Sequence, residues 1–185
     1  MKFDVIIGNP PYQLSDGGAQ ASASPLYHLF IQQAKKLNPR YLTMIIPARW
    51  YAGGKGLDAF RDEMLDDIHI KELHDFPITD DCFPGVNIRG GICYFLWDRA
   101  YDNRRTLTTV VTHTKNEQQV MLRHLRYEDL NIFIRNGFAL KILEKVNSIS
   151  KGDTLSQYVS PRKPFGISTD FVKSADFHLT PNGLR

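Results

Sequence analysis

Short runs of apolar residues alternate along this chain with segments in which apolar residues recur every three or four positions. Runs bounded by Gly and Pro are typical of buried strands, and the wider spacing is typical of amphipathic helices. Val5, Ile6 and Ile7 are consecutive and apolar, which predicts a buried strand near the start of the chain. In all, the pattern predicts strands over residues 3–7, 41–46, 68–76 and 91–97.

Two helices are predicted between these strands. Ser24 and Pro25 form a typical helix start, with Ser as the cap and Pro at the first helical position. Asn38-Pro39 ends this helix, and a glycine-bearing loop over residues 50–56 precedes the second one. The apolar positions are Leu26, Leu29, Phe30, Ala34 and Leu37 in the first helix, and Leu57, Phe60 and Met64 in the second.

The order strand, helix, strand, helix, strand, strand predicts an α/β fold. We expect a largely parallel sheet covered by helices, with a final antiparallel strand that forms a hairpin-like pair. We expect its core to include Leu29, Phe30, Met44, Trp50 and Leu73.

The pattern changes beyond Asp98. Residues 106–112 predict one more strand and residues 138–149 one amphipathic helix, whereas the chain from Lys151 has three prolines and no clear periodicity. We therefore expect three parts: a sheet domain over 1–100, a connecting segment over 101–150, and a mixed, irregular segment over 151–185 that is a linker or the start of another domain.

Composition narrows the class of protein. With 42% hydrophobic and 23% charged residues the chain can bury a core. No apolar run is long enough for a membrane span, and two cysteines without zinc-like pairing fit a reduced, cytoplasmic setting. Residues 1–98 hold 9 Lys/Arg against 12 Asp/Glu, and residues 99–185 hold 14 against 8. The basic second half points weakly to nucleic acid, and a solvated basic surface explains it equally well.

The first strand ends abruptly in Asn9-Pro10-Pro11-Tyr12. Each proline stiffens the residue before it and removes an N–H, so the backbone leaves the strand in a fixed, extended form. The Asn9 carboxamide oxygen and the Pro10 carbonyl can each accept a hydrogen bond from an exocyclic amino group on a flat ring. Stacking of the ring on Tyr12 would contribute about 1–3 kcal/mol. A strand-ending turn without chemistry is the alternative, and the apolar strand preceding the motif favours the substrate-binding interpretation.

The sequence "FDVIIGNPPYQ" resembles motif IV of the S-adenosylmethionine-dependent amino-methyltransferases, most closely the adenine-specific (N6) DNA methyltransferases of type II restriction-modification systems. The segments "YHLFIQQAKKLNPRYLTMIIPARWYAGG", "FPITDDCFPGVNIRGGICYFLWDR" and "SPRKPFG" are similar to later parts of that family, in the same order. The resemblance implies that residues 1–100 are a partial methyltransferase catalytic domain, the C-terminal half of a Rossmann-like sheet spanning motifs IV to VIII. It also implies that 151–185 begins a target-recognition region.

Site residues follow from this resemblance. It implies catalytic roles for Asn9, Pro10, Pro11 and Tyr12, with Tyr12 stacked on an adenine flipped out of double-stranded DNA. Phe83 matches the family's second aromatic contact to the base. Asn87, Arg89, Arg162 and Lys163 are candidate DNA contacts, and Gly90-Gly91 would permit a close backbone approach.

One part of the family pattern is missing. The glycine-rich turn of motif I, which binds S-adenosylmethionine, normally precedes Asn-Pro-Pro-Tyr, and here the motif IV strand begins almost at Met1. We therefore expect a fragment that by itself neither binds the methyl donor appreciably nor methylates DNA. The cofactor-binding residues are unknown, with Asp4 and Tyr12 as the residues expected near that site. We expect partners in a missing N-terminal half or a nuclease subunit or domain, and self-association through an exposed sheet edge.

Other functions remain open at this point. Glutamine methyltransferases acting on proteins, and RNA amino-methyltransferases, use the same motif or close variants. A restriction nuclease is disfavoured because no Asp and Glu-x-Lys cluster follows a strand. A non-catalytic DNA-binding or interaction module is a further alternative. No metal site is expected, because the six histidines lack ligand spacing and Asp80-Asp81 fits a solvated loop.

Overall fold

The computed structural model describes residues 3–14, 24–128, 130–150, 155 and 158–159, and the short strands at 179–180 and 183–184. The chain divides into two compact units, residues 1–141 and 142–185. The first unit contains all the elements discussed below, apart from the end of α4 and the strand pair β7–β8. Among the described residues, no helix is both long and apolar enough to cross a membrane.

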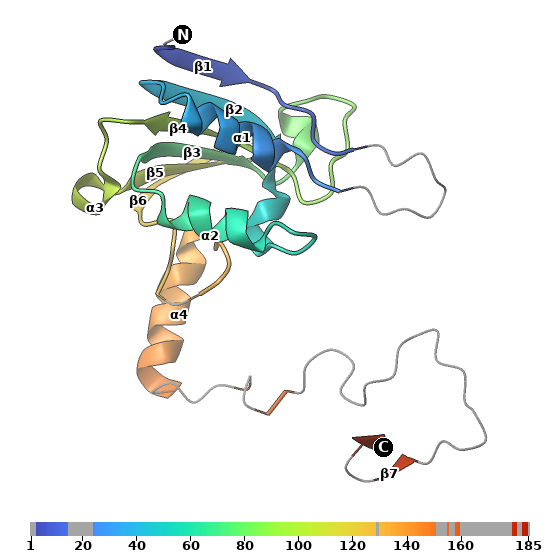
Figure 1. Cartoon of the computed structure of the whole chain (residues 1–185). Helices are drawn as coiled ribbons and strands as arrows, with labels where there is room; N and C mark the ends of the chain where they lie inside the picture. The colour runs from blue at the N-terminus through green and yellow to red at the C-terminus, as the bar shows by residue number, and fades with distance from the viewer. Residues whose placement is uncertain are drawn as a thin grey trace. The chain divides into compact units, whose positions relative to one another are not determined.

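A six-stranded sheet forms the centre of the first unit, in the order β1-β2-β4-β3-β5-β6 (Figure 1). The strands β1, β2, β3 and β5 run in one direction, and β4 and β6 run in the other. Up to residue 98 the sheet is therefore parallel except for its final strand, as predicted, and β3 and β4 form the expected antiparallel pair. The bounds are β1 Val5–Gly8, β2 Tyr41–Pro47, β3 Ile70–Phe76, β4 Ile92–Asp98, β5 Thr108–His113 and β6 Gln118–Arg123.

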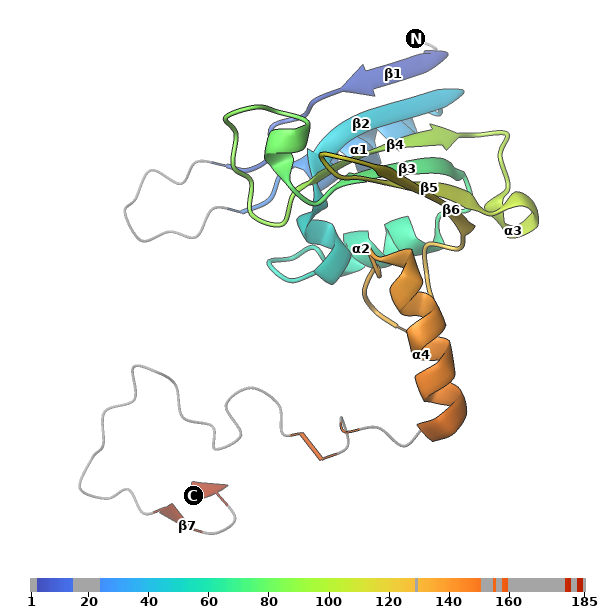
Figure 2. The ribbon, with the colours of Figure 1, turned by 180° about the vertical axis from the view of Figure 1, so that it is seen from behind.

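Two helices, α1 (Tyr27–Lys36) and α2 (Asp58–Asp66), lie on the same face of this sheet (Figures 1 and 2). The strand β2 shows the consequence, because Leu42, Met44 and Ile46 are buried under the helices while the alternate positions are only half-buried. Between β2 and α2 the chain forms a short 3₁₀ helix, η1 (Ala48–Ala52).

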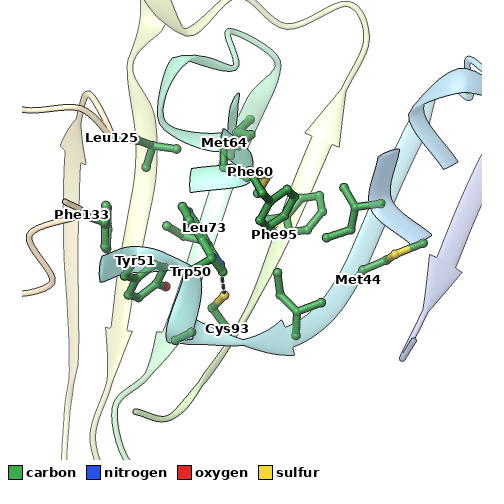
Figure 3. Packing of buried hydrophobic residues seen from close by; sticks show 14 of the residues in the cluster. Met44, Trp50, Tyr51, Phe60, Met64, Leu73, Cys93, Phe95, Leu125 and Phe133 are labelled. Atoms are coloured by element: carbon green, nitrogen blue, oxygen red, sulfur yellow. Dashed lines mark hydrogen bonds between the residues drawn. The ribbon is translucent and has the colours of Figure 1, made fainter. Parts of the chain in front are cut away.

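The core between sheet and helices is rich in large side chains (Figure 3). Trp50 is fully buried, as predicted, and its indole N–H donates to the Cys93 sulfur at 3.4 Å. Leu57, Phe60 and Met64 are all fully buried, which confirms the predicted core-facing side of α2.

The first helix differs from its prediction. It begins at Tyr27, its cap residue Leu26 makes no side-chain cap hydrogen bond, and Pro25 instead pairs with Gln13 in an isolated β-bridge. Leu29 and Phe30 are 45% and 41% exposed, so their assignment to the core is wrong. The core-facing positions are Tyr27, Ile31 and Ala34, which recur at helical spacing and so share one side of the helix.

The first strand is also less buried than predicted. Among the described strands, β1 pairs only with β2 and forms an edge of the sheet. Val5 and Ile7 are 51% and 77% exposed, and Ile6 packs against the core. The consecutive apolar run therefore predicted the strand correctly, but the strand is not fully buried among the described residues.

The segment after β4 contains more structure than its sequence pattern indicates. The predicted strand and helix are present as β5 and α4 (Gly137–Ser150). The short helix α3 (Asn103–Thr106) and the strand β6 were not predicted. In the second unit β7 (Leu179–Thr180) and β8 (Gly183–Leu184) form an antiparallel pair, and Arg162 and Lys163 lie outside the described residues.

Candidate active site

The candidate site lies at one edge of the sheet. Because β1, β2 and β3 run in the same direction, the segments that follow them meet at the edge where open α/β sheets bind ligands. These segments are Asn9–Tyr12 after β1, η1 after β2, and the loop 77–91 between β3 and β4. Figures 1 and 2 both show this loop beside the segment that follows β1.

The backbone around Asn-Pro-Pro-Tyr is held by the segment that leads into α1. The Leu26 N–H donates to the Tyr12 carbonyl at 3.0 Å, and the Leu14 N–H donates to the Ser24 carbonyl at 3.0 Å. Pro10 is buried and Asn9 is exposed. The motif is therefore fixed from both ends, by the β1–β2 ladder before it and by these bonds after it.

A cavity of about 760 Å³ opens at this edge, within the usual size range of ligand sites. It brings together most of the predicted residues, namely the whole Asn9–Tyr12 motif with Asn87 and Arg89. The remaining lining residues, which the sequence analysis did not single out for this site, are Gln13, Pro25, Tyr27, Pro47, Arg49, Lys55 and Ile88.

Two residues of the cavity lining carry acceptors without a hydrogen-bond partner among the described residues. Neither the Asn9 side chain nor the Pro10 carbonyl forms a hydrogen bond with any described residue. Both residues line the cavity, and both groups can accept hydrogen bonds.

Two tyrosine hydroxyls at the cavity also lack hydrogen-bond partners among the described residues, those of Tyr12 and Tyr27. Burial raises the pKa of Tyr12, and the nearby Cys82 and Cys93 thiols raise it further. Burial also raises the pKa of Tyr27 well above its usual value, although Arg49 and the Trp50 backbone oppose the shift. Both hydroxyls therefore stay protonated at neutral pH and can donate.

The loop 77–91 is braced internally and against the sheet. The Thr79 hydroxyl donates to the Ile88 carbonyl at 3.1 Å, and the Asp80 carboxylate accepts from the Gly85 N–H at 2.7 Å. Gly91 has a φ of +80°, and a Cβ there would collide with the carbonyl oxygen of Phe76. Gly91 thus permits a close approach to the protein's own backbone. The sequence had predicted a close approach to substrate instead.

Two predicted residues lie elsewhere. Phe83 belongs to the same loop but does not line the cavity, although its neighbour Cys82 is close enough to Tyr12 to raise its pKa. Asp4 precedes β1, at the end of the strand opposite to Asn9, where its carbonyl accepts from the Arg40 and Tyr41 N–H groups at 2.9 Å each.

The charge of the cavity is one-sided. Arg49, Lys55 and Arg89 line it, and no described Asp or Glu does. Adenosine ribose in folds of this kind is held by an acidic side chain. The described lining therefore does not by itself fit S-adenosylmethionine, and no step is derived through that cofactor. Nor do the described residues contain a cluster of three or more His, Cys, Asp or Glu that could hold a metal ion.

Sequence comparison finds one family and one relative to which the chain is similar. Residues 1–83 match the model of the Eco57I restriction-modification methylase family. A relative from Mycoplasma pneumoniae, described as an uncharacterized adenine-specific methylase, is 37% identical over 162 residues. The match covers 83% of this chain and 38% of the relative, so the chain spans well under half the relative's length. The chain is thus similar to adenine-specific methylases of restriction-modification systems.

Solved structures give a more distant likeness. The methyltransferase subunit of a type I restriction-modification system from Streptococcus thermophilus is 15% identical, with a TM-score of 0.43, over 83% of this chain and 33% of that subunit. A modification subunit of a putative type I restriction enzyme from Vibrio vulnificus is 13% identical, with a TM-score of 0.42, over 83% of this chain and 32% of that one. Likenesses at this level carry no conclusion about function.

Proposed function

We propose that this chain carries the adenine-binding part of a type II DNA adenine-N6 methyltransferase whose methyl donor is S-adenosylmethionine. One observation carries the proposal: Asn9 and Pro10, whose acceptors have no hydrogen-bond partner among the described residues, line a cavity together with Tyr12 at the carboxyl ends of the parallel strands β1 and β2. The methyl donor supplies the group transferred, and its binding residues lie outside the described cavity lining.

The residues act on the amino group in a defined way. The two N–H bonds of the adenine amino group donate to the Asn9 Oδ1 and the Pro10 carbonyl, which draws the nitrogen lone pair out of conjugation with the ring. Pro11 keeps Pro10 extended, and Tyr12 stacks on the base. The second aromatic contact, from Phe83, stays a prediction because this side chain lies outside the cavity lining.

The charge of the cavity favours a nucleic acid over a protein glutamine. Three cationic side chains and no described carboxylate line it, and a polyanion matches this lining whereas a neutral side-chain amide gains nothing from it. We propose double-stranded DNA as the substrate, with the target adenine flipped out of the helix.

The remaining assignments belong to the same proposal. A nuclease subunit or domain, further residues that bind the methyl donor, and a second copy paired through the exposed β1 edge are the proposed partners. The proposed location is the bacterial cytoplasm.

Binding of this chain to short single-stranded DNA tests the adenine site. The probe is a fluorescent oligonucleotide with one adenine among thymines, compared with the same oligonucleotide carrying purine, which lacks the amino group. We expect the adenine probe to bind about three to ten times more tightly than the purine probe, because the purine probe lacks one or two hydrogen bonds. The Asn9→Ala variant should reduce this difference, because only the Pro10 acceptor remains, and Asn9→Asp, which keeps an acceptor oxygen, should retain it.

Asn116→Ala is the matched control, because Asn116 is exposed in the turn between β5 and β6. It should leave both affinities unchanged. Equal binding of the adenine and purine probes by the unaltered chain would contradict the proposed role of Asn9.

A further inference from the structure

A second cavity, of about 380 Å³, adjoins the first at the same edge of the sheet. Arg49 and Arg89 line both cavities, so the two arginines stand on the boundary between them. Arg135, with Ile132 and Phe133, lines the second cavity only.

Arg49 and Arg89 are exposed, and neither forms an ion pair with a carboxylate of the described residues. Other arginines of the same unit do form such pairs, among them Arg61 with Asp58 and Arg135 with Asp75. No described Asp or Glu lines either cavity. The boundary therefore carries two arginines without an ion pair among the described residues, although Asp80 lines a neighbouring cavity together with Arg89, and this positive charge favours an anionic ligand.

The backbones of the two arginines are connected. Arg49 lies in η1 between Ala48 and the buried Trp50, and the Ala48 N–H donates to the Gly91 carbonyl at 3.0 Å. Next to Arg89, the Gly90 carbonyl accepts from Arg135 Nη1 at 2.7 Å. The two guanidinium-bearing segments are thus held at a fixed separation before any ligand arrives.

We propose that Arg49 and Arg89 bind the phosphodiester that joins the target nucleotide to its neighbour, and that the second cavity takes the sugar and phosphate of that neighbour. An anion that links two units, one in each cavity, is the chemistry of a polynucleotide strand. Guanidinium groups match phosphate oxygens through paired N–H donors. This inference rests on the proposed function for the identity of the first cavity's ligand.

Single-phosphate neutralisation tests the proposal. The 185-residue chain is titrated with a single-stranded oligonucleotide containing one adenine among thymines, and with versions in which one phosphate at a time is a methylphosphonate. We expect one position next to the adenine to weaken binding about tenfold. Arg49→Gln and Arg89→Gln should each weaken binding about tenfold, lose the sensitivity to that one position, and lower the slope of log affinity against log salt by about 0.7.

Arg49→Lys, which keeps the charge without the paired donors, should keep the salt slope and lose part of the affinity. Arg105→Gln is the matched control, since the Arg105 side chain is 86% exposed and distant in the fold from both cavities' lining residues. Thermal unfolding of each variant checks that the fold is kept.

Two failures are distinguishable. If Arg49→Gln binds like Arg105→Gln, or if no single methylphosphonate position depends on Arg49, the phosphate site is wrong whatever the base preference. If adenine and purine probes bind equally but the Arg49-dependent position persists, the phosphate site stands and the proposed adenine site fails.

Discussion

Arg135 binds Asp75 through two hydrogen bonds, Nε to Oδ2 at 2.8 Å and Nη2 to Oδ1 at 2.6 Å, although 60 positions separate them in the chain. Asp75 lies near the end of β3 and is fully buried. Through the Gly90 carbonyl the same guanidinium also holds the loop that carries Arg89. The segment after β6 therefore fixes the edge of the sheet where the candidate site lies.

Removing Arg135 should destabilise the fold strongly. Arg135→Met leaves the Asp75 carboxylate buried without its partner, and we expect the free energy of unfolding to fall by about 2–4 kcal/mol in urea titrations. Arg104→Met is the matched control, because the Arg104 side chain is 67% exposed and pairs with Asp102 at the surface. Its cost should be much smaller than that of Arg135→Met, because an exposed ion pair contributes little to stability. Equal costs for the two variants would show that the Asp75 pair is not a structural bond.

Gly91 and Gly85 make a second matched comparison. Both have positive φ, +80° and +78°, but a Cβ at Gly91 meets the Phe76 and Pro77 backbone whereas a Cβ at Gly85 meets open space. Gly85→Ala should cost about 1–2 kcal/mol of folding free energy, from the backbone conformation alone. Gly91→Ala should cost about 3–5 kcal/mol, since the collision adds to that strain. Chemical denaturation measures both, and similar costs would contradict the close packing at Gly91.

The two cysteines should differ in reactivity. Burial raises the pKa of the Cys93 thiol to about 12, and the Cys93 side chain is fully buried. Burial also raises the pKa of Cys82, which is only half-buried. Because the thiolate is the nucleophile, an aromatic disulfide reagent at pH 8 should modify Cys82 slowly and Cys93 only after unfolding. Mass spectrometry of the labelled peptides identifies the site, and Cys82→Ala should abolish native-state labelling.

The same raised pKa sets a pH dependence of stability. The folded Cys93 keeps its proton up to about pH 12, whereas the unfolded thiol loses it near pH 9. Its contribution to stability is complete below pH 9 and is lost as the pH rises towards 12, by up to about 1.4 kcal/mol per pH unit. Stability that stays constant between pH 8 and pH 11 in urea titrations would contradict the burial of this thiol.

The methyl donor should bind this chain weakly. The cavity presents cations and no described carboxylate to the ribose and amino groups of S-adenosylmethionine. Calorimetric titration of the 185-residue chain should therefore give no micromolar binding, either with S-adenosylmethionine or with S-adenosylhomocysteine, which lacks the positive sulfonium. Micromolar affinity for either compound would mean that residues outside the described lining complete the cofactor site within this chain.

Local sequence pattern was sufficient for the elements with strong periodicity. Leu57, Phe60 and Met64 recur at helical spacing and are all buried, and the strand over 41–46 appears as β2. The pattern was insufficient where packing against other elements decides which side chains are buried. Leu29 and Phe30 are as apolar as Ile31, and the packing of α1 against the sheet, which no local pattern encodes, determines that Ile31 is the buried one.

The lining of the candidate cavity was predictable where one stretch of chain contributes it. Asn9–Tyr12 is a contiguous motif after an apolar strand, and its residues do line one cavity. Arg49 and Tyr27 reach the same cavity from different elements, through strand order and helix placement that no local pattern encodes. Phe83 is the opposite case. It lies in a segment that resembles the family, but its side chain does not line the cavity.

The hydrogen bonds of the adenine amino group test the central claim most directly. A short oligonucleotide whose single adenine carries ¹⁵N at the amino position is bound to the chain and followed by nuclear magnetic resonance. We predict two separate amino proton signals, both shifted downfield and protected from exchange with water, with one of them lost in Asn9→Ala. A single, freely exchanging amino signal in the bound state, unchanged in Asn9→Ala, would contradict the claim that Asn9 and Pro10 bind this group.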